Sequence, residues 1–220
     1  MFGTYRPLQL AVLAGAIIAS QATPFTAMAD VIVKHSKGET SLPTTPQKVL
    51  VFDMASLDTL TALGVEVDGV PSGAKPDYLS RYERDDVLKI GSLFEPDFET
   101  VNAAQPDLII VGGRSSAKFA DLSKIAPTID LTVSSEHYIE SAKKNVRTLA
   151  EIFGKTDEAE VALQELDTSI QRLNDKAASA GKGLLMLTTG GKMSTYGAGS
   201  RFGVLFSDYG VQQADESIKV

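Results

Sequence analysis

The sequence contains no cysteine and no tryptophan, and only two of its 220 residues are histidine. Without cysteine the chain forms no disulfide, carries no lipid on a cysteine and offers no thiolate to a metal. A zinc site needs three or four ligands in fixed geometry, but His35 and His137 lie far apart in the sequence. We therefore predict that both histidines are surface residues and that no protein side chains bind a metal.

The sequence signatures of common enzymes are absent as well. There is neither the Gly-x-Ser-x-Gly motif of a hydrolase nucleophile nor the Gly-x-x-x-x-Gly-Lys-Ser/Thr motif of a phosphate-binding loop. The segment GAGSRFG, residues 197–203, has two glycines of a dinucleotide-binding fingerprint but lacks the third at the required spacing. These absences argue against an enzyme, for example a periplasmic hydrolase.

Acidic residues outnumber basic residues by 28 to 21, which gives a formal net charge of −7 at pH 7. A chain with this balance is a poor general binder of nucleic acid or of anionic membranes. An anionic ligand would therefore need a local basic site. Hydrophobic residues make up 43% of the sequence, which is typical of a globular protein and not of a disordered one.

Residues 1–29 have the pattern of a signal peptide. Arg6 provides a positive start, and Leu10–Ala19 is an apolar run too short to span a bilayer as a mature helix. Ala27–Ala29 is a small-x-small cleavage site, so we expect the mature chain to begin at Asp30 and to be exported to a bacterial periplasm. An uncleaved membrane anchor is the alternative.

Two apolar runs, Lys48–Phe52 and Asp107–Val111, are typical of strands buried on both faces of a parallel sheet. The first run and a further predicted strand, Glu66–Val70, flank a helical pattern. Asp53 is expected to cap that helix and Gly64 to end it. This arrangement is a βαβ unit, whose crossover is nearly always right-handed, so we predict an α/β fold.

The longest helical pattern runs from Asp157 to Ser179 without glycine or proline. Its apolar residues recur at spacings of four and three and form one seam, made up of Ala159, Leu163, Leu166, Ile170 and Leu173. Asp157 and Glu160 are expected to form a capping pair, and Gly181 to end the helix. Such a helix spans about 35 Å. We interpret it as a rigid connection between two lobes; an ordinary core helix is the alternative.

After this helix the sequence predicts two strands, 184–189 and 192–196, and a short helix, Phe202–Tyr209. So short a segment cannot bury a core of its own. We expect either that it adds to the first lobe or, as we favour, that the sequence is a fragment. The predicted division is a signal peptide (1–29), an N-terminal α/β lobe (30–154), a connecting long helix (155–181) and the start of a truncated C-terminal α/β lobe (182–220).

Arginine lies beside glycine in two predicted loops, GGR ending at Arg114 and GAGSR ending at Arg201. Each loop follows a predicted strand, and ligands of open α/β sheets bind at the carboxyl ends of the strands. The guanidinium group suits anionic oxygens, and glycine lets a ligand approach the backbone closely. The pattern indicates an anion-binding cleft; two solvated surface arginines are the alternative.

Several segments resemble a known family. They are LPTTPQKVLVFDMASLDTLTALGVEVDGVP, GSLFEPDFETVNAAQPDLIIVGGRSS, LSKIAPTIDL and KMSTYGAGSRFGVLFSDYGVQQAD. The family is that of periplasmic ferric-siderophore-binding proteins, which are helical-backbone (class III) substrate-binding proteins of ABC iron importers. The resemblance covers nearly all of residues 31–220. It implies two Rossmann-like α/β lobes joined by a single long helix, with the ligand between them and the second lobe incomplete here.

The resemblance also implies site residues. Arg114 and Arg201 would contact an anionic ferric siderophore of the catecholate type, with Tyr196 and Lys75 as further ligand-binding candidates. Glu99 would dock the ABC permease of the inner membrane through a salt bridge, although a role in capping its own helix is the alternative. Because the siderophore holds the iron in this family, neither a cofactor nor a protein metal ligand is expected. The resemblance implies a monomer that binds no nucleic acid.

Family members continue beyond the position that matches Val220 and complete their second lobe there. The function that the resemblance implies is the capture of a ferric siderophore in the periplasm and its delivery to the permease. Three alternatives stay open at this point. The chain could be a binder of haem, cobalamin or a metal ion with the same fold, for which Tyr196 is a candidate haem ligand; it could be a truncated, non-functional fragment; or it could be an enzyme.

Overall fold

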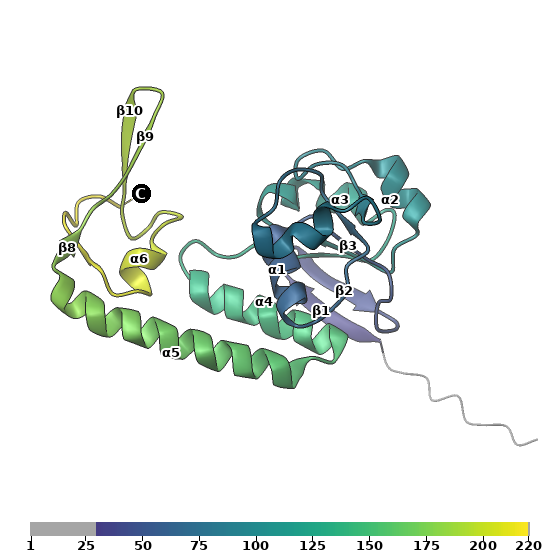
Figure 1. The fold of residues 1–220 in the computed structure, drawn as a ribbon, viewed down its shortest axis with the longest axis horizontal. Helices are drawn as coiled ribbons and strands as arrows, with labels where there is room; N and C mark the ends of the chain where they lie inside the picture. Colours follow the sequence, from purple (N-terminus) through teal and green to yellow (C-terminus); the bar gives the residue numbers. More distant parts are fainter. Residues whose placement is uncertain (1–29, 220) are drawn as a thin grey trace, which may run out of the picture.

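The computed structural model describes residues 30–219, which adopt a mixed α/β fold around a parallel sheet (Figure 1). Its five strands lie in the order β5 (Leu88–Lys89), β4 (Gly69–Val70), β3 (Val49–Val51), β6 (Leu108–Val111) and β7 (Thr128–Asp130). The predicted α/β class, with a parallel sheet and a long helix, is confirmed. The predicted signal peptide, 1–29, lies outside the described residues. Within residues 30–219, no helix combines the length and the apolar character needed to cross a bilayer.

The central strands β3 and β6 are buried on both faces, as predicted. Val49 and Val51 of β3 belong to one core cluster, whereas Leu50 and Phe52 belong to a second. Because successive residues of a strand point to opposite faces, an unbroken apolar run supplies both clusters. The covering helices are α1 (Met54–Ala62) and α4 (Tyr138–Phe153) on the first face and α2 (Phe98–Ala104) and α3 (Phe119–Leu122) on the second.

Local capping sets the start of the helices that follow the strands. The Asp53 carboxylate accepts a hydrogen bond from the backbone N–H of Ser56 at 2.8 Å, so the predicted cap of α1 is confirmed. Gly64, with φ of 71°, ends the helix in the left-handed conformation that glycine adopts without strain. The segment after β6 begins with a 3₁₀ helix, η2 (Gly113–Lys118), which α3 continues. A second 3₁₀ helix, η1, spans Asp77–Glu83.

An N-terminal hairpin, β1 (Val31–His35) and β2 (Gly38–Leu42), packs beside β7. The backbone N–H of Ser36 donates to the carbonyl oxygen of Asp130 at 3.0 Å, in the turn between the two strands. The Thr40 hydroxyl donates to the Thr128 carbonyl oxygen at 2.7 Å. These bonds satisfy main-chain groups at the edge of the parallel sheet and fix the hairpin there.

The prediction that both histidines are surface residues is wrong for His35. Its ring is half-buried and packs against Phe119 of α3, with 5.3 Å between the ring centroids. Its Nε2 atom lies 2.9 Å from Thr40 Oγ1. The hairpin turns this side chain inward, which strand periodicity alone did not indicate because the alternation of β1 is irregular. His137 is exposed, as predicted.

Helix α5 (Thr156–Ala180) confirms the predicted long helix and runs beside α4 (Figure 1). The two helices are joined at Gly154, whose φ of 65° reverses the chain. Ion pairs connect them: Arg147 Nε lies 2.7 Å from Glu160 Oε1, and Lys143 Nζ lies 2.6 Å from Asp167 Oδ1. The amino-terminal half of α5 thus packs against the sheet region, which we define as residues 30–153.

Two predictions about α5 need correction. The capping pair is wrong, because the residue at the cap position is Lys155, which makes no side-chain capping bond, and Glu160 is turned toward Arg147 on α4. The apolar seam is buried only in part: Ala159 and Leu163 are buried, but Leu173 is 46% exposed. Its spacing matches a helix face, yet other parts of the chain cover that face along only part of its length.

Residues 182–219, the C-terminal region, contain a hairpin that projects away from α5 (Figure 1). The elements are β8 (Lys182–Gly183), β9 (Leu185–Thr189), β10 (Lys192–Tyr196), α6 (Val204–Ser207) and β11 (Gln212–Gln213). Strands β9 and β10 meet at Gly190 and Gly191, whose φ angles of 57° and 78° suit a tight hairpin turn. The helix predicted over Phe202–Tyr209 is confined to α6, since Gly203 takes part in a turn through its N–H bond to the Ser200 carbonyl oxygen at 2.8 Å.

Candidate functional site

The loop that carries Arg114 begins at the carboxyl end of β6. A Cβ atom at Gly112 would lie 2.9 Å from Asp53 Cγ, so only glycine fits between β6 and the start of α1. Gly113 has a φ of 52°, which L side chains rarely adopt. Local structure therefore explains both glycines of the GGR motif. The motif places Arg114 at the carboxyl end of β6, the edge of a parallel sheet at which ligands usually bind.

Arg114 is exposed and lies beside an aromatic ring. Its guanidinium carbon is 5.9 Å from the centroid of the Phe94 ring. The same residue borders a pocket of about 230 Å³, whose other lining residues are Phe52, Asp53, Met54, Leu93, Gly112 and Gly113. All of them belong to the sheet region, and they bring one guanidinium group, that of Arg114, and one carboxyl group, that of Asp53, to the pocket.

A buried carboxylate lies behind the Arg114 loop. Asp130, at the end of β7, is fully buried and accepts hydrogen bonds from the Thr132 N–H at 2.9 Å, the Thr132 hydroxyl at 2.5 Å and the Ser116 hydroxyl. Burial alone would raise the pKa of Asp130, but the hydrogen bonds from Ser116 and Thr132 outweigh it and lower the pKa. The carboxylate is therefore charged and fully engaged.

Arg201 and Tyr196 meet through a shared aromatic neighbour. The Arg201 guanidinium carbon lies 4.6 Å from the centroid of Phe202, and the Tyr196 ring packs edge-on against Phe202 with centroids 5.0 Å apart. The loop is compact, because the Ser200 hydroxyl donates to the Gly197 carbonyl oxygen at 2.7 Å. The exposed arginine is thus presented on a small aromatic platform, as a cation over the face of a ring.

Lys75 is turned into its own loop. Its ammonium group donates to the carbonyl oxygens of Pro71 at 2.9 Å and Gly73 at 3.1 Å. Burial lowers the pKa of Lys75, nearby Lys89 lowers it further, and Glu83 partly offsets both. Its role as a ligand-binding residue stays a prediction, and in this conformation its hydrogen-bonding capacity is largely used.

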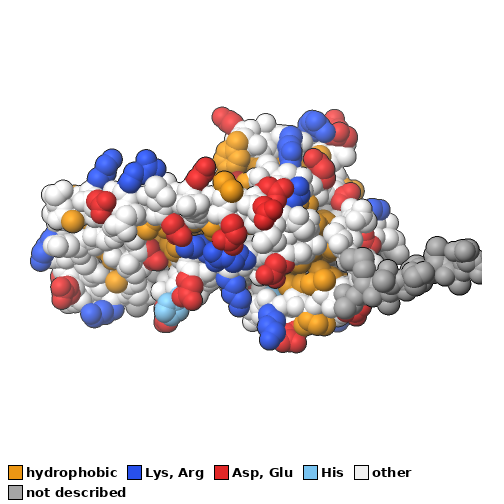
Figure 2. Space-filling view, turned by 90° about the horizontal axis from the view of Figure 1, so that it is seen from below, with side chains coloured by type: hydrophobic (Ala, Val, Ile, Leu, Met, Phe, Trp, Pro, Cys, Tyr) orange, Lys and Arg blue, Asp and Glu red, His pale blue; other side chains and the backbone are white. Residues whose placement is uncertain are grey.

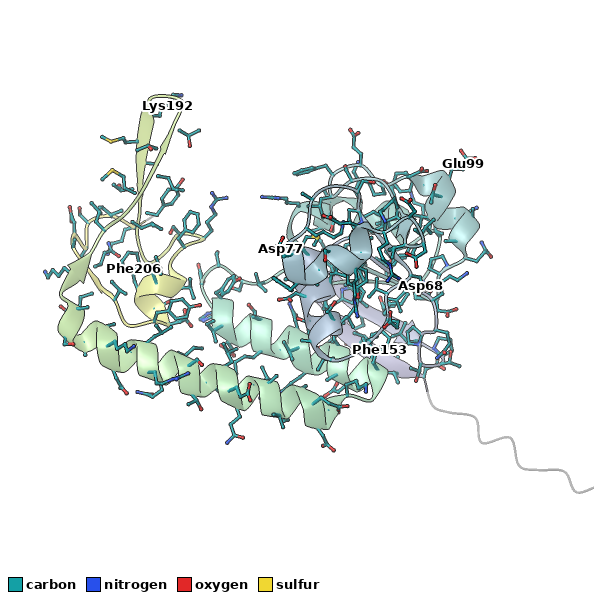
Figure 3. The ribbon with its side chains drawn as sticks, in the orientation of Figure 1. Asp68, Asp77, Glu99, Phe153, Lys192 and Phe206 are labelled. Carbon is teal, nitrogen blue, oxygen red and sulfur yellow. The ribbon has the colours of Figure 1, made fainter. Side chains whose placement is uncertain are left out.

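Glu99 lies in the first turn of α2 and is exposed, with its side chain directed away from the sheet (Figure 3). The capping role that was its alternative is carried by Asp97, whose carboxylate accepts from the Thr100 N–H at 3.0 Å and the Thr100 hydroxyl at 2.8 Å. The position of Glu99 is compatible with contact to a partner, and docking stays a prediction.

The structure brings some of the predicted site residues together and keeps others apart. Arg201 and Tyr196 share Phe202, whereas the residues around Arg114 all come from the sheet region and include neither of them. Phe94, Phe202 and Asp130 were not predicted from the sequence as residues of the site. Phe202 directly follows Arg201, so an aromatic residue beside this arginine was the signal available, whereas Phe94 lies 20 positions before Arg114 and gave no local signal.

The charge pattern favours local recognition over a broad charged surface. On the face in Figure 2, basic and acidic side chains are interspersed, with apolar patches between them. Within residues 30–219, no three His, Asp or Glu side chains gather closely enough to hold a metal ion.

Comparison with known proteins gives consistent matches. The chain matches the protein family described as "Periplasmic binding protein" over residues 49–219. It is 42% identical over 194 residues to the petrobactin-binding protein YclQ of Bacillus subtilis, covering 86% of this chain and 61% of YclQ. It is 30% identical over 194 residues to the ferric-anguibactin-binding protein FatB of Vibrio anguillarum, covering 86% and 60%. The chain therefore spans about 60% of the length of these curated relatives.

Solved structures agree with these matches. The crystal structure of YclQ superposes with a TM-score of 0.83 at 40% identity, covering 88% of this chain and 70% of that one. The periplasmic catecholate-siderophore binding protein VctP from Vibrio cholerae superposes with a TM-score of 0.79 at 34% identity, covering 84% and 67%.

Proposed function

The chain belongs to the family of periplasmic binding proteins, and from this premise we propose that it captures a ferric siderophore of the catecholate type in the periplasm. In this proposal it delivers the loaded siderophore to the inner-membrane permease of an ABC importer. It acts by binding and not as an enzyme. The iron arrives already held by the siderophore, so the protein itself needs no cofactor.

The observation that carries the proposal is the pairing of each candidate arginine with an aromatic ring. Arg114 lies near Phe94, and Arg201 lies over Phe202, which packs against Tyr196. A catecholate is an aromatic ring that bears anionic oxygens. Guanidinium groups suit the oxygens, and aromatic faces suit the ring, so this combination recognises both properties of one ligand.

The relatives support the same class of ligand. Their names describe the binding of petrobactin, ferric anguibactin and a catecholate siderophore. At 42% identity over most of this chain, we transfer the class, a ferric siderophore, and leave the individual compound to experiment.

The remaining parts of the proposal concern the organisation of the chain. Residues 30–154 form one α/β lobe and residues 182–220 form the start of a second, truncated one, joined by a connecting helix, 155–181, with the ligand held between the lobes. Residues 1–29 act as a cleavable signal peptide, and the exported protein is a monomer.

The proposal also assigns roles outside the arginine pair. Tyr196 packs on a catechol ring, and Glu99 docks the permease through a salt bridge. Lys75 reaches the ligand only after leaving the carbonyl oxygens of its own loop, so it ranks behind the arginines as a ligand-binding residue.

Isothermal titration of the chain from Asp30 onward with a ferric tris-catecholate complex tests this function. We expect saturable binding, weakened about 10-fold or more by Arg114→Ala or Arg201→Ala, since a hydrogen bond to a charged group contributes about 1.5–3 kcal/mol. Arg172→Ala is the matched control, because Arg172 is an exposed arginine on α5 whose side-chain partner is Ser169. This control should leave the affinity unchanged.

Two outcomes would contradict the proposal in different ways. Equal affinity of the wild-type protein and both arginine variants would refute the assignment of Arg114 and Arg201 to the binding site but not the proposed class of ligand. Tighter binding of haem, cobalamin or ferric ion without siderophore would remove the ligand class itself.

A further inference from the structure

The loop that carries Arg114 is tied to the neighbouring strand by the buried carboxylate of Asp130. We propose that Asp130 is a positioning residue, which fixes this loop so that Arg114 is held ready for an anionic ligand. The inference rests on the proposed function for its consequence, but the tie itself is a property of the free protein. Asp130 acts on Arg114 indirectly, through the residues on either side of that arginine.

The first half of the tie reaches the loop before Arg114. Asp130 accepts a hydrogen bond from the Thr132 hydroxyl at 2.5 Å. The oxygen of the same hydroxyl accepts a hydrogen bond from the backbone N–H of Gly113 at 2.9 Å. Since the Thr132 proton is committed to the carboxylate, its oxygen is oriented to receive the Gly113 N–H. The charge on Asp130 is therefore relayed to the residue directly before Arg114.

The second half of the tie reaches the chain after Arg114. The Ser116 hydroxyl donates to the other carboxylate oxygen of Asp130. Arg114 thus lies between two points, Gly113 and Ser116, that are both held by one fully buried group. The carboxylate is a rigid anchor for two reasons: it is buried, and its own strand, β7, is paired with β6 throughout.

The loop needs such an anchor because of its own sequence. Two adjacent glycines, Gly112 and Gly113, leave the backbone more freedom than any other pair of residues would. Inside the loop, the Ser115 hydroxyl bonds only to Gly112, at 3.0 Å and 3.1 Å. That local contact stabilises the turn but does not connect it to the neighbouring strand. The hydrogen bonds to Asp130 and Thr132 make that connection.

The tie also extends to the N-terminal hairpin. The backbone N–H and the hydroxyl of Ser36 both donate to the carbonyl oxygen of Asp130 at 3.0 Å. The main chain of Asp130 is therefore held from one side while its side chain holds the Arg114 loop on the other. This arrangement makes Asp130 the residue where the hairpin, β7 and η2 meet.

Hydrogen exchange of the ligand-free protein tests the tie directly. In Asp130→Asn and in Thr132→Val, the Gly113 amide should exchange about 10-fold or more faster than in the wild-type protein, since its acceptor is disoriented or lost. Amides of Ile109 and Ile110 in β6 should keep their protection. Thr132→Val is the safer variant, because Thr132 is exposed and the substitution conserves its shape.

Asp107→Asn is the matched control. Asp107 also accepts main-chain hydrogen bonds, from Gln47 and Lys48 at 2.9 Å and 2.8 Å, but it lies at the opposite, amino-terminal end of β6. It should leave the exchange of the Gly113 amide unchanged. Unchanged exchange at Gly113 in both Asp130→Asn and Thr132→Val would overturn the inference.

A double-mutant cycle tests the consequence for binding. Titration with the ferric tris-catecholate complex should give about 5- to 20-fold weaker binding for Thr132→Val, and no further loss when Thr132→Val is added to Arg114→Ala. An equal loss with and without Arg114 would show that Thr132 and Asp130 do not act through Arg114, which overturns the positioning role. Absence of binding by the wild-type protein would refute the proposed function, while the exchange experiment would still decide whether the tie exists.

Discussion

At the scale of single residues, the GGR motif shows how one glycine can be required without any unusual backbone angle. Gly112 has φ of −175°, which is extended backbone that any residue adopts. What excludes a side chain is the Asp53 carboxyl group, 2.9 Å from the position of a Cβ atom. Asp53 is held there because it caps α1. The cap of this helix therefore determines that the residue after β6 is glycine.

His35 is the residue whose protonation should be visible in the stability of the protein. Its Nδ1 atom accepts a hydrogen bond from the Lys37 N–H at 3.2 Å, which requires that nitrogen to be unprotonated. Burial lowers the pKa of His35, and the charge of Asp130 offsets this only in part. The folded protein therefore favours the neutral ring.

We predict that the free energy of unfolding decreases as the pH falls below about 6.5, the ordinary pKa of histidine. Between the lowered pKa of the folded state and that value, the unfolded chain binds a proton that the folded chain does not, so acid favours unfolding. Urea unfolding at several values between about pH 7.5 and pH 5 measures the slope. The lowered pKa of Asp130 acts in a separate window, because its stabilisation is lost as the pH falls below about 4, the ordinary pKa of aspartate, toward the lowered pKa of the folded state.

The variant His35→Asn should show a smaller slope over that range. His137→Asn is the control, since His137 is exposed at the start of α4, and it should keep the wild-type slope. The same slope in His35→Asn and the wild-type protein would show that His35 does not carry the pH dependence.

At the scale of secondary structure elements, α5 shows that a periodic pattern of apolar residues predicts a helix but not the burial of each residue. The spacing of its apolar residues correctly predicted a helix and nearly its bounds. It could not predict burial, because burial depends on what lies opposite each turn. Leu163 is 3% exposed, whereas Leu173, on the same predicted seam, is 46% exposed.

We expect Leu163→Ala to destabilise the protein by about 2–4 kcal/mol, the usual range when a buried leucine is truncated. Leu173→Ala should cost less than about 1 kcal/mol, because its side chain already contacts water. Urea unfolding followed by circular dichroism measures both values. Equal costs would indicate that Leu173 is covered in solution, and the seam would then be a continuous buried stripe as the sequence suggested.

Other elements show the same division between local and non-local information. The parallel sheet was predictable because β3 and β6 are unbroken apolar runs, and the cap at Asp53 was predictable because its partner lies three residues away. The inward turn of His35 was not, because its ring packs against Phe119, 84 positions along the chain. The buried Asp130 was not, because a strand pattern does not show which polar residue the fold will bury. For the candidate site, the arginines and their glycines could be read locally, whereas Phe94 and Asp130 required the fold.

At the scale of the whole molecule, the net charge of −7 does not exclude an anionic ligand. At physiological ionic strength, exposed charges interact over about 8 Å, so the two arginine loops respond mainly to their own surroundings. Interspersed acidic and basic groups, as on the face in Figure 2, further cancel the distant field.

Burial is distributed unevenly over the chain, and this distribution predicts where the molecule opens. The sheet region has two core clusters, whereas Met186 and Leu187 of β9 and Met193 of β10 are 45%, 39% and 73% exposed. A two-stranded hairpin is marginally stable without packing against its face. Lys192 lies at the tip of this hairpin (Figure 3), so we expect trypsin to cut residues 30–219 first after Lys192.

Mass spectrometry of a time course of limited digestion checks this expectation. In Lys192→Gln, the first cut should move to Lys182 or Arg201 and stay within the C-terminal region, because the region opens as a unit and the loss of one site does not make it more stable. Lys124 is the internal reference, since it is an exposed lysine, paired with Asp121 at 2.7 Å, in the well-packed sheet region. A first cut at Lys124 would mean that the sheet region opens more readily than the hairpin, which the burial of its two cores argues against.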